Sequence, residues 1–136
     1  MIYYLDTNIC IYFLTGRSSS VLNSVKSKSP DQIKIPSLVK AELLFGAEKS
    51  DRKSENIERI NNFLLPYEII PFDDDCSVTY SKIRSILERK GTIVGPNDLI
   101  IASTVMTNDG ILITNNDKEY SYIKGLKISN WIKESG

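Results

Sequence analysis

The sequence contains no histidine, and this absence removes several kinds of catalytic and metal site. Catalysis by Ser-His-Asp or Cys-His groups is excluded, as are zinc sites of the HExxH type. The two cysteines, Cys10 and Cys76, are far apart in the sequence and are too few for a tetrahedral zinc site without histidine. An enzyme of this composition therefore has to use carboxylates, hydroxyls, lysine or a bound hard metal ion.

The chain also has no formal net charge and no long apolar run. The chain has 17 basic and 17 acidic residues, which argues against binding nucleic acid mainly through a large basic surface. A nuclease whose own acids offset its basic residues is still compatible with this balance. No apolar run is long enough to span a membrane, no secretory leader is recognisable, and two separate cysteines are typical of a reduced compartment. We therefore expect a cytoplasmic protein without a membrane partner.

The length and the pattern of apolar residues predict one α/β domain, expected to span residues 1–136. Short apolar runs bounded by turn residues alternate with stretches of helical spacing. The expected strands are 2–5, 32–36, 67–72, 111–114 and 126–128. The expected helices are 7–14, 38–50, 57–65, 73–91 and 96–106, with shorter ones after Ser18 and around Tyr120. This alternation predicts a parallel sheet with helices on both faces.

Two further expectations concern single helices. Ser37 is expected to cap the helix that follows the second strand. The helix that Asp73, Asp74 and Asp75 open should bury a stripe made of Val78, Ile83, Ile86 and Leu87. Its three acids lie at the positive end of the helix dipole, so we interpret them as a solvated helix start.

Asp6 stands where the first apolar run ends and the first helix begins. Open α/β sheets bind ligands beyond the carboxyl ends of their strands, so an acid at this point can be functional. Aspartate is also a common N-cap, and from this stretch alone capping is the simpler interpretation. The decision between the two depends on whether other acids lie at the same edge.

Further acids follow the second strand, the fourth strand and the start of the most apolar helix. Glu42 shares a helix face with apolar neighbours, and Asp98 shares one with Ile101 and Ala102. Asp117 and Glu119 come shortly after the fourth strand. Each has a simpler explanation: Glu42 as an exposed helix residue, Asp98 as an acid in a first helical turn, and the last two as a turn and a solvated helix start.

Taken together, these acids map to one edge of one predicted sheet. Crowded carboxylates repel one another, and a bound divalent cation relieves that repulsion. All-oxygen ligands without histidine or thiolate suit Mg²⁺ or Mn²⁺. Such a cluster is typical of phosphodiester hydrolysis, in which the metal activates water and stabilises developing charge.

The same stretches resemble those of PIN-domain ribonucleases and, among these, the VapC toxins of toxin–antitoxin pairs. The matching stretches run in order along nearly the whole chain: Leu5-Asp6-Thr7-Asn8, Ala41-Glu42-Leu43 with Gly46-Ala47, Gly95-Pro96-Asn97-Asp98 with Ile101-Ala102, and Thr114-Asn115-Asn116 before Lys118-Glu119-Tyr120. The resemblance implies a three-layer PIN fold, with a mostly parallel sheet of about four to five strands flanked by helices.

The resemblance also implies a set of site residues and a Mg²⁺ or Mn²⁺ cofactor. Asp6, Glu42 and Asp98 would be catalytic acids that coordinate the metal. Glu119 matches the acid in the family pattern Thr-x-Asn-x-x-acid-aromatic, whereas Asp117 could bind a second metal or a water. Supporting polar side chains would be Thr7, Asn8 and Asn116.

The function implied by the resemblance is metal-dependent endonucleolytic cleavage of RNA, with structured RNA such as tRNA as the substrate class and inhibition of translation as the result. The expected partners are a VapB-type antitoxin, held in a groove as an apolar helix or extended tail, and a second copy of the chain. Regions 41–47 and 49–58 resemble those used for these contacts, and operator DNA would be bound only through the antitoxin. RNA contacts are expected from Arg17, Lys40, Arg84 and Lys118, although such residues often lie on merely solvated faces.

Two other functions remain open at this stage: a PIN-like housekeeping nuclease, and a non-catalytic partner in an antitoxin–DNA repressor complex. A phosphatase of the haloacid dehalogenase type would need a second Asp two residues after Asp6, where this chain has Asn8. A receiver domain would need an acid pair at the end of the first strand, where only Asp6 is present.

Overall fold

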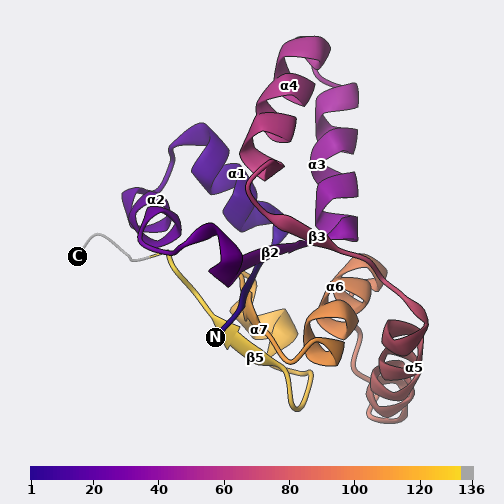
Figure 1. Cartoon of the computed structure of the whole chain (residues 1–136). Coiled ribbons are helices and arrows are strands. Elements are labelled where there is room, and N and C mark those ends of the chain that lie inside the picture. Colours follow the sequence, from indigo (N-terminus) through magenta and orange to yellow (C-terminus); the bar gives the residue numbers. More distant parts are fainter. Residues whose placement is uncertain (133–136) are drawn as a thin grey trace.

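The computed structural model of the chain describes residues 1–132 and has a parallel sheet at its centre (Figure 1). Its five strands lie in the order β3-β2-β1-β4-β5, and every neighbouring pair is parallel. They are β1 Tyr3–Leu5, β2 Ile33–Pro36, β3 Glu68–Ile70, β4 Ile111–Ile113 and β5 Lys127–Ser129. The expected α/β fold with four to five mostly parallel strands is confirmed, whereas the expected domain end at residue 136 lies outside the described residues.

Helices flank the sheet and extend beyond it. They are α1 Thr7–Thr15, α2 Ser19–Lys26, α3 Ser37–Glu48, α4 Lys53–Leu64, α5 Asp74–Arg89, α6 Pro96–Thr107 and α7 Asp117–Tyr120, with a 3₁₀ turn, η1, at Pro30–Gln32. Helices α3 and α4 pack together in a hairpin that projects from the sheet, and α5 packs against α6 away from that hairpin (Figure 1). No helix within residues 1–132 has the length and apolar character needed to cross a membrane.

The core lies around the two central strands. Tyr4 and Leu5 of β1 are consecutive residues, and both are almost completely buried, as are Leu112 and Ile113 of β4. Consecutive strand residues point to opposite faces of a sheet, so burial of both means that both faces are covered. The run of four apolar residues before Asp6 is explained by this central position.

The order of the strands creates a switch point beside β1. The chain builds β2 and β3 outward on one side of β1, then returns to the other side for β4 and β5. The carboxyl ends of β1 and β4 flank the place where this direction reverses. Open α/β sheets bind their ligands at such places, so this edge is where functional side chains are expected.

Side chains cap the starts of α1, α2 and α5, and one expected cap is absent. Asp6 precedes α1 and accepts from the Thr7 N–H, Ser18 accepts from Val21 at α2, and Asp73 accepts from Cys76 at α5. The hydrogen bond from the Cys76 N–H lowers the pKa of Asp73. The expectation that Ser37 caps α3 is wrong, because β2 continues through Pro36 and the helix begins at Ser37 itself.

The expected apolar stripe of α5 is partly wrong. Ile83 and Leu87 are buried, but Val78 and Ile86 are 54% and 43% exposed. The buried face instead begins at Cys76, from which Ile83 and Leu87 follow at spacings that keep one helical face. Val78 is two residues from Cys76, about 200° around the helix, and therefore faces solvent.

A glycine before β4 provides a test of how tightly this core is packed. A Cβ at Gly110 would overlap the ring of Tyr4, which is 1% exposed. We expect Gly110→Ala to lower the free energy of unfolding by about 1–3 kcal/mol, because a fixed ring in a close-packed core has no room to move. Urea unfolding measures the change.

The matched control is Gly46→Ala in α3, where a Cβ meets no atom within 4 Å. That change should raise the free energy of unfolding by about 0.5–1 kcal/mol, because glycine loses more conformational entropy than alanine when the chain folds into a helix. Equal effects of the two substitutions would contradict the described contact between Gly110 and Tyr4.

Candidate functional site

Asp6 lies at the switch point, directly after β1, and is fixed there by three hydrogen bonds. Its backbone N–H donates to the Ile113 carbonyl of β4 at 2.9 Å. Its Oδ1 accepts from the Thr7 N–H at 2.9 Å, and its Oδ2 accepts from the Thr114 hydroxyl at 2.8 Å. Asp6 therefore caps α1, as expected, and also presents a carboxylate between the ends of β1 and β4, so the cap is compatible with the functional role predicted for this residue.

Glu42 reaches the same edge from the second turn of α3. The Thr7 hydroxyl donates to Glu42 Oε1 at 2.6 Å, and the Asn97 side-chain amide donates to Oε2 at 3.4 Å. The hydrogen bond expected from Thr7 to one of the acids is therefore present. Through these two contacts Glu42 joins α3 to the starts of α1 and α6.

Asp98 and Glu119 form the other side of the group. The Tyr120 hydroxyl donates to Asp98 Oδ1 at 3.1 Å. Glu119 Oε1 accepts from the Gly95 N–H at 2.7 Å, and Oε2 accepts from the Asn116 side chain at 2.8 Å. Asn116, expected as a supporting polar residue, thus orients Glu119.

The pKa values of Asp6, Asp98 and Glu119 are shifted by burial, by hydrogen bonds and by the charges of the neighbouring acids. Burial raises the pKa of Asp6, the bonds from Thr114 and Thr7 oppose this, and the charges of Glu42 and Glu119 raise it further. Burial, with the charges of Glu119 and Asp6, raises the pKa of Asp98 to about 6. The bond from Gly95 lowers the pKa of Glu119. The negative charges of these carboxylates repel one another, and a cation among them would relieve the repulsion.

The structure separates the two candidates for the fourth acid. Glu119 is half-buried and bonded into the group, whereas the exposed Asp117 accepts from the Asn130 side chain at 3.3 Å. Asn8 is exposed on α1 and makes no hydrogen bond to these acids in the described part of the chain. The structure therefore brings together Asp6, Glu42, Asp98 and Glu119 with Thr7 and Asn116, and leaves Asp117 and Asn8 outside.

The donor set fits a hard divalent cation by its chemistry. All its ligand atoms are carboxylate oxygens, the type that Mg²⁺ and Mn²⁺ prefer. A Cβ at Gly95 would lie 3.5 Å from Glu119 Oε1 and 3.6 Å from Asp98 Oδ2, which is ordinary van der Waals contact, so both oxygens lie beside the backbone at Gly95. Over residues 1–132, however, no three acids are gathered closely enough to enclose an ion. The acids are held by hydrogen-bond donors at neighbouring positions instead.

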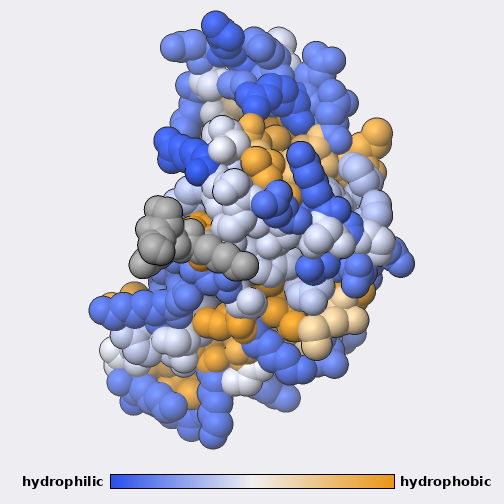
Figure 2. Space-filling view, turned by 90° about the vertical axis from the view of Figure 1, so that its left-hand side faces the viewer, coloured by the Kyte–Doolittle hydropathy of each residue, from blue (hydrophilic) through white to orange (hydrophobic). Residues whose placement is uncertain are grey.

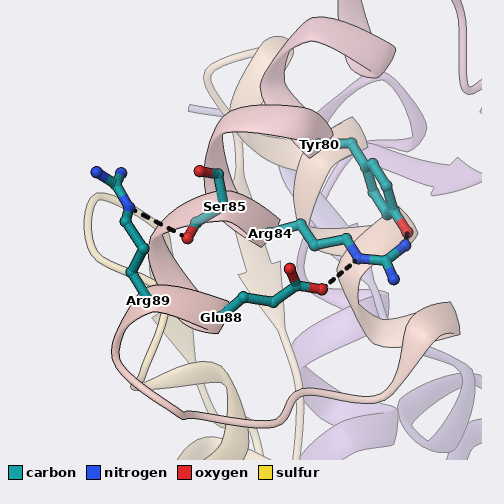
Figure 3. Close-up of polar contacts among 5 residues, drawn as sticks. All are labelled: Tyr80, Arg84, Ser85, Glu88 and Arg89. Carbon is teal, nitrogen blue, oxygen red and sulfur yellow. Dashed lines mark hydrogen bonds and ion pairs between the residues drawn. The ribbon is translucent and has the colours of Figure 1, made fainter.

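The basic residues expected to contact RNA are mostly exposed and are not bonded to this group among the described residues. Arg17, Arg84 and Lys118 are exposed and Lys40 is half-exposed. Arg84 is held within α5 by Glu88 at 3.1 Å and by the Tyr80 hydroxyl at 3.0 Å, while Arg89 donates to the Ser85 carbonyl at 3.4 Å (Figure 3). No hydrogen bond or ion pair found within residues 1–132 joins these side chains to the acids, and their contact with RNA stays a prediction.

Sequence reasoning missed three groups that orient the acids: the Thr114 hydroxyl, the Tyr120 hydroxyl and the Gly95 N–H. Thr114 was recognisable as the end of the expected fourth strand and as part of the family pattern, but its contact with Asp6 requires β4 to lie beside β1. That neighbour relation is a matter of strand order, which the sequence pattern does not contain.

Comparison with known proteins adds a consistent set of relatives. Residues 3–126 match the PIN domain family. A ribonuclease VapC2 of Rickettsia felis is 42% identical over 98% of this chain and 100% of its own length, and a tRNA(fMet)-specific endonuclease VapC of Salmonella typhimurium is 31% identical over 95% and 97%. The crystal structure of VapBC2 from Rickettsia felis bound to a promoter DNA fragment has a chain that superposes with a TM-score of 0.90 at 41% identity, covering 96% of this chain and 99% of that one.

The bond from Thr114 to Asp6 can be tested by stability. In Thr114→Val the shape is kept, but Asp6 loses a donor and the Asn116 N–H loses its acceptor. We expect the free energy of unfolding to fall by about 2–3 kcal/mol at neutral pH in metal-free buffer, because a hydrogen bond to a buried charge is lost. Thr114→Ser, which keeps the hydroxyl, is the control in chemical denaturation.

The deficit of Thr114→Val should depend on pH. Thr114 stabilises the ionised form of Asp6, so the deficit is full above the folded-state pKa of Asp6 and shrinks as pH falls through it. Because burial raises that pKa, the shrinkage should begin above the ordinary aspartate range near ~4. A deficit that is constant with pH would show that the charge on Asp6 has no part in it.

Proposed function

This chain belongs to the PIN-domain family and, within it, to the VapC ribonucleases, and we propose that it cleaves RNA at the four acids grouped around the end of β1. It is the endoribonuclease toxin of a VapBC-type toxin–antitoxin pair. The observation that carries the proposed site is the position of Asp6 at the switch point, with three further acids from other parts of the chain held near it by their own hydrogen-bond donors.

PIN-domain nucleases generally depend on a divalent metal, and we propose Mg²⁺ or Mn²⁺ for this chain. Asp6, Glu42 and Asp98 would hold it, with Glu119 as the fourth acid. When bound, such a cation activates water and offsets the charge that builds up on the phosphate. The hydrogen bonds from Thr7, Thr114, Asn97 and Tyr120 keep the acids oriented for binding, so little reorganisation is needed when RNA arrives.

For the substrate we propose a structured RNA, with tRNA as the first class to test. The Salmonella typhimurium relative is a tRNA(fMet)-specific endonuclease and aligns over 95% of this chain. The acids repel phosphate, so positive side chains elsewhere must hold the RNA backbone. We propose Arg17, Lys40, Arg84 and Lys118 for this role, and a cytoplasmic location where such RNA is found.

The partner we propose is a VapB-type antitoxin, and a groove between α1, α3 and α4 is our proposed place for it. The Rickettsia felis relative forms a VapBC2 complex that binds a promoter DNA fragment, so DNA contact here is proposed to pass through the antitoxin. Figure 2 shows a hydrophobic patch below the tip of the α3–α4 hairpin, bordered by hydrophilic side chains. We also propose that two copies of the chain pair in the assembled complex.

The groove has the form that an apolar helix or tail requires. Its cavity has a volume of about 320 Å³ and is lined mainly by apolar residues, among them Ile11, Leu14, Leu43, Ala47 and Ile60. Glu42 lines it as well, so an occupant would reach the acid group directly. An antitoxin seated there would block RNA without any change in the fold.

We expect the purified chain to cleave RNA in Mg²⁺ or Mn²⁺ and to stop when EDTA is added. Asp6→Asn should lower the rate at least about 100-fold, because the charge stabilisation supplied through this ligand is worth several kcal/mol. The measurement is cleavage of a total tRNA pool followed on denaturing gels. If wild type and Asp6→Asn cleave equally, the activity belongs to a contaminant.

The identity of the fourth acid is tested by a matched pair of substitutions. Glu119→Gln removes the charge from the half-buried carboxylate bonded to Gly95 and Asn116, and Asp117→Asn removes it from the exposed neighbour. We expect Glu119→Gln to cut the rate about 10-fold or more and Asp117→Asn to stay near wild type. Loss of activity in Asp117→Asn alone would assign the fourth position to Asp117.

A further inference from the structure

Asn130 lies at the same edge of the sheet as Asp6 and Thr114, one strand further out. The parallel registers of β1 with β4 and of β4 with β5 place the residues that follow these three strands side by side. The Thr114 N–H donates to the Ser129 carbonyl at 3.0 Å, so the pairing of the strands continues as far as this row. Asn130 therefore extends the row of polar residues that begins with Asp6.

The side chain of Asn130 holds the turn between β4 and α7 on both sides of Asn116. Its Nδ2 donates to Asn115 Oδ1 at 3.2 Å and to Asp117 Oδ1 at 3.3 Å. Its Oδ1 accepts from the Ile132 N–H at 2.9 Å. A backbone N–H only donates and an ionised carboxylate only accepts, so the orientation of this amide is fixed. Its two donated bonds tie the residues before and after Asn116 to the end of β5.

Asn116 connects this turn to the acids. Its side chain donates to Glu119 Oε2 at 2.8 Å, and its backbone N–H donates to the Thr114 hydroxyl at 2.9 Å. That hydroxyl is the group that donates to Asp6 Oδ2. The position of Asn116 therefore affects the donors of two of the four acids.

The segment that carries Asn130 is itself anchored to the rest of the molecule. The Trp131 carbonyl accepts from the Ser20 hydroxyl at 2.8 Å, and the Trp131 ring lies 5.3 Å from the ring of Tyr3 in β1. The ammonium group of Lys28 lies over both rings, 5.3 Å from the first and 5.4 Å from the second. The exposed turn is thus held by a residue whose own position is fixed.

We propose that Asn130 is a positioning residue for RNA cleavage and acts through Asn116 on two of the four acids. This inference rests on the proposed function and adds to it a residue from the end of β5. It also gives Asp117 a role, because its carboxylate is one of the two acceptors by which Asn130 holds the turn. A side chain that orients an active-site group typically contributes about 10-fold or more to activity without touching the substrate.

Exchanging the donor and the acceptor tests the bond between Asn130 and Asp117. In Asn130→Asp both donated bonds are lost and a second carboxylate faces Asp117, so the turn should open. In the double variant Asn130→Asp with Asp117→Asn, an amide at position 117 donates to a carboxylate at position 130, and the bond is restored in the opposite direction. We expect the rate of tRNA cleavage to fall about 10-fold in Asn130→Asp and to recover in the double variant.

The matched control is Asp117→Asn alone. Its side-chain oxygen still accepts from Asn130, so its cleavage rate should equal that of wild type. Because the double variant contains both substitutions, its recovery would show that the loss in Asn130→Asp comes from the broken bond and not from the change at position 130 itself.

Amide hydrogen exchange of the same full-length variants, followed by NMR without RNA, tests the inference independently of activity. The Asn116 N–H, bonded to Thr114, should exchange about 10-fold faster in Asn130→Asp and at the wild-type rate in the double variant. The Ile111 N–H, which donates to the Ile2 carbonyl within the sheet, should not change. Equal acceleration at both amides would mean that the whole fold is loosened, and would overturn a role specific to the turn.

The outcomes separate this inference from the proposed function. A wild-type chain that cleaves no RNA overturns the proposed function, whatever the exchange rates are. Cleavage by wild type at the same rate as by Asn130→Asp overturns the role of Asn130 alone, as does a loss that the double variant does not recover. Unchanged exchange of the Asn116 N–H in Asn130→Asp also overturns it.

Discussion

The hydrogen bond from Thr114 to Asp6 is the contact on which the site depends. It joins the residue after β4 to the residue after β1, at 2.8 Å between two side chains that are almost completely buried. A carboxylate at this depth is costly unless donors satisfy it. Asp6 can be ionised here because the Thr7 N–H and the Thr114 hydroxyl donate to its two oxygens, and the strand order is what places that hydroxyl beside it.

Each of the remaining acids is likewise held by hydrogen-bond donors of its own. Glu42 receives Thr7 and Asn97, Asp98 receives Tyr120, and Glu119 receives Gly95 and Asn116. These donors hold the acids close enough to shift one another's pKa values, yet not gathered on one point within residues 1–132. The proposed site thus combines acids that are oriented by hydrogen bonds with a mutual repulsion that a bound cation would relieve.

Much of this arrangement is contained in the sequence, and the rest is set by tertiary structure. The apolar run before Asp6 and the acids in early helical turns were enough to predict a parallel sheet and to place Asp6, Glu42 and Asp98 at one edge. The roles of Thr114 and Tyr120 were not predictable, because they depend on which strands are neighbours. The errors were local. Helix α5 buries Cys76 instead of Val78, since a two-residue step turns a side chain to the other side of a helix. Ser37 does not cap α3, because no loop separates β2 from this helix.

The wide spacing of the site along the chain has a consequence for when the protein becomes active. The bond between Thr114 and Asp6 spans 108 positions, and the bond between Gly95 and Glu119 uses a residue near the end of the described chain. A ribosome that has made the first hundred residues has therefore produced Asp6 and Asp98 without Thr114 and Tyr120, whose hydroxyls donate to them. An enzyme that cleaves RNA is thereby kept incomplete until the segment from Thr114 to Tyr120 has been synthesised and has folded against the earlier residues.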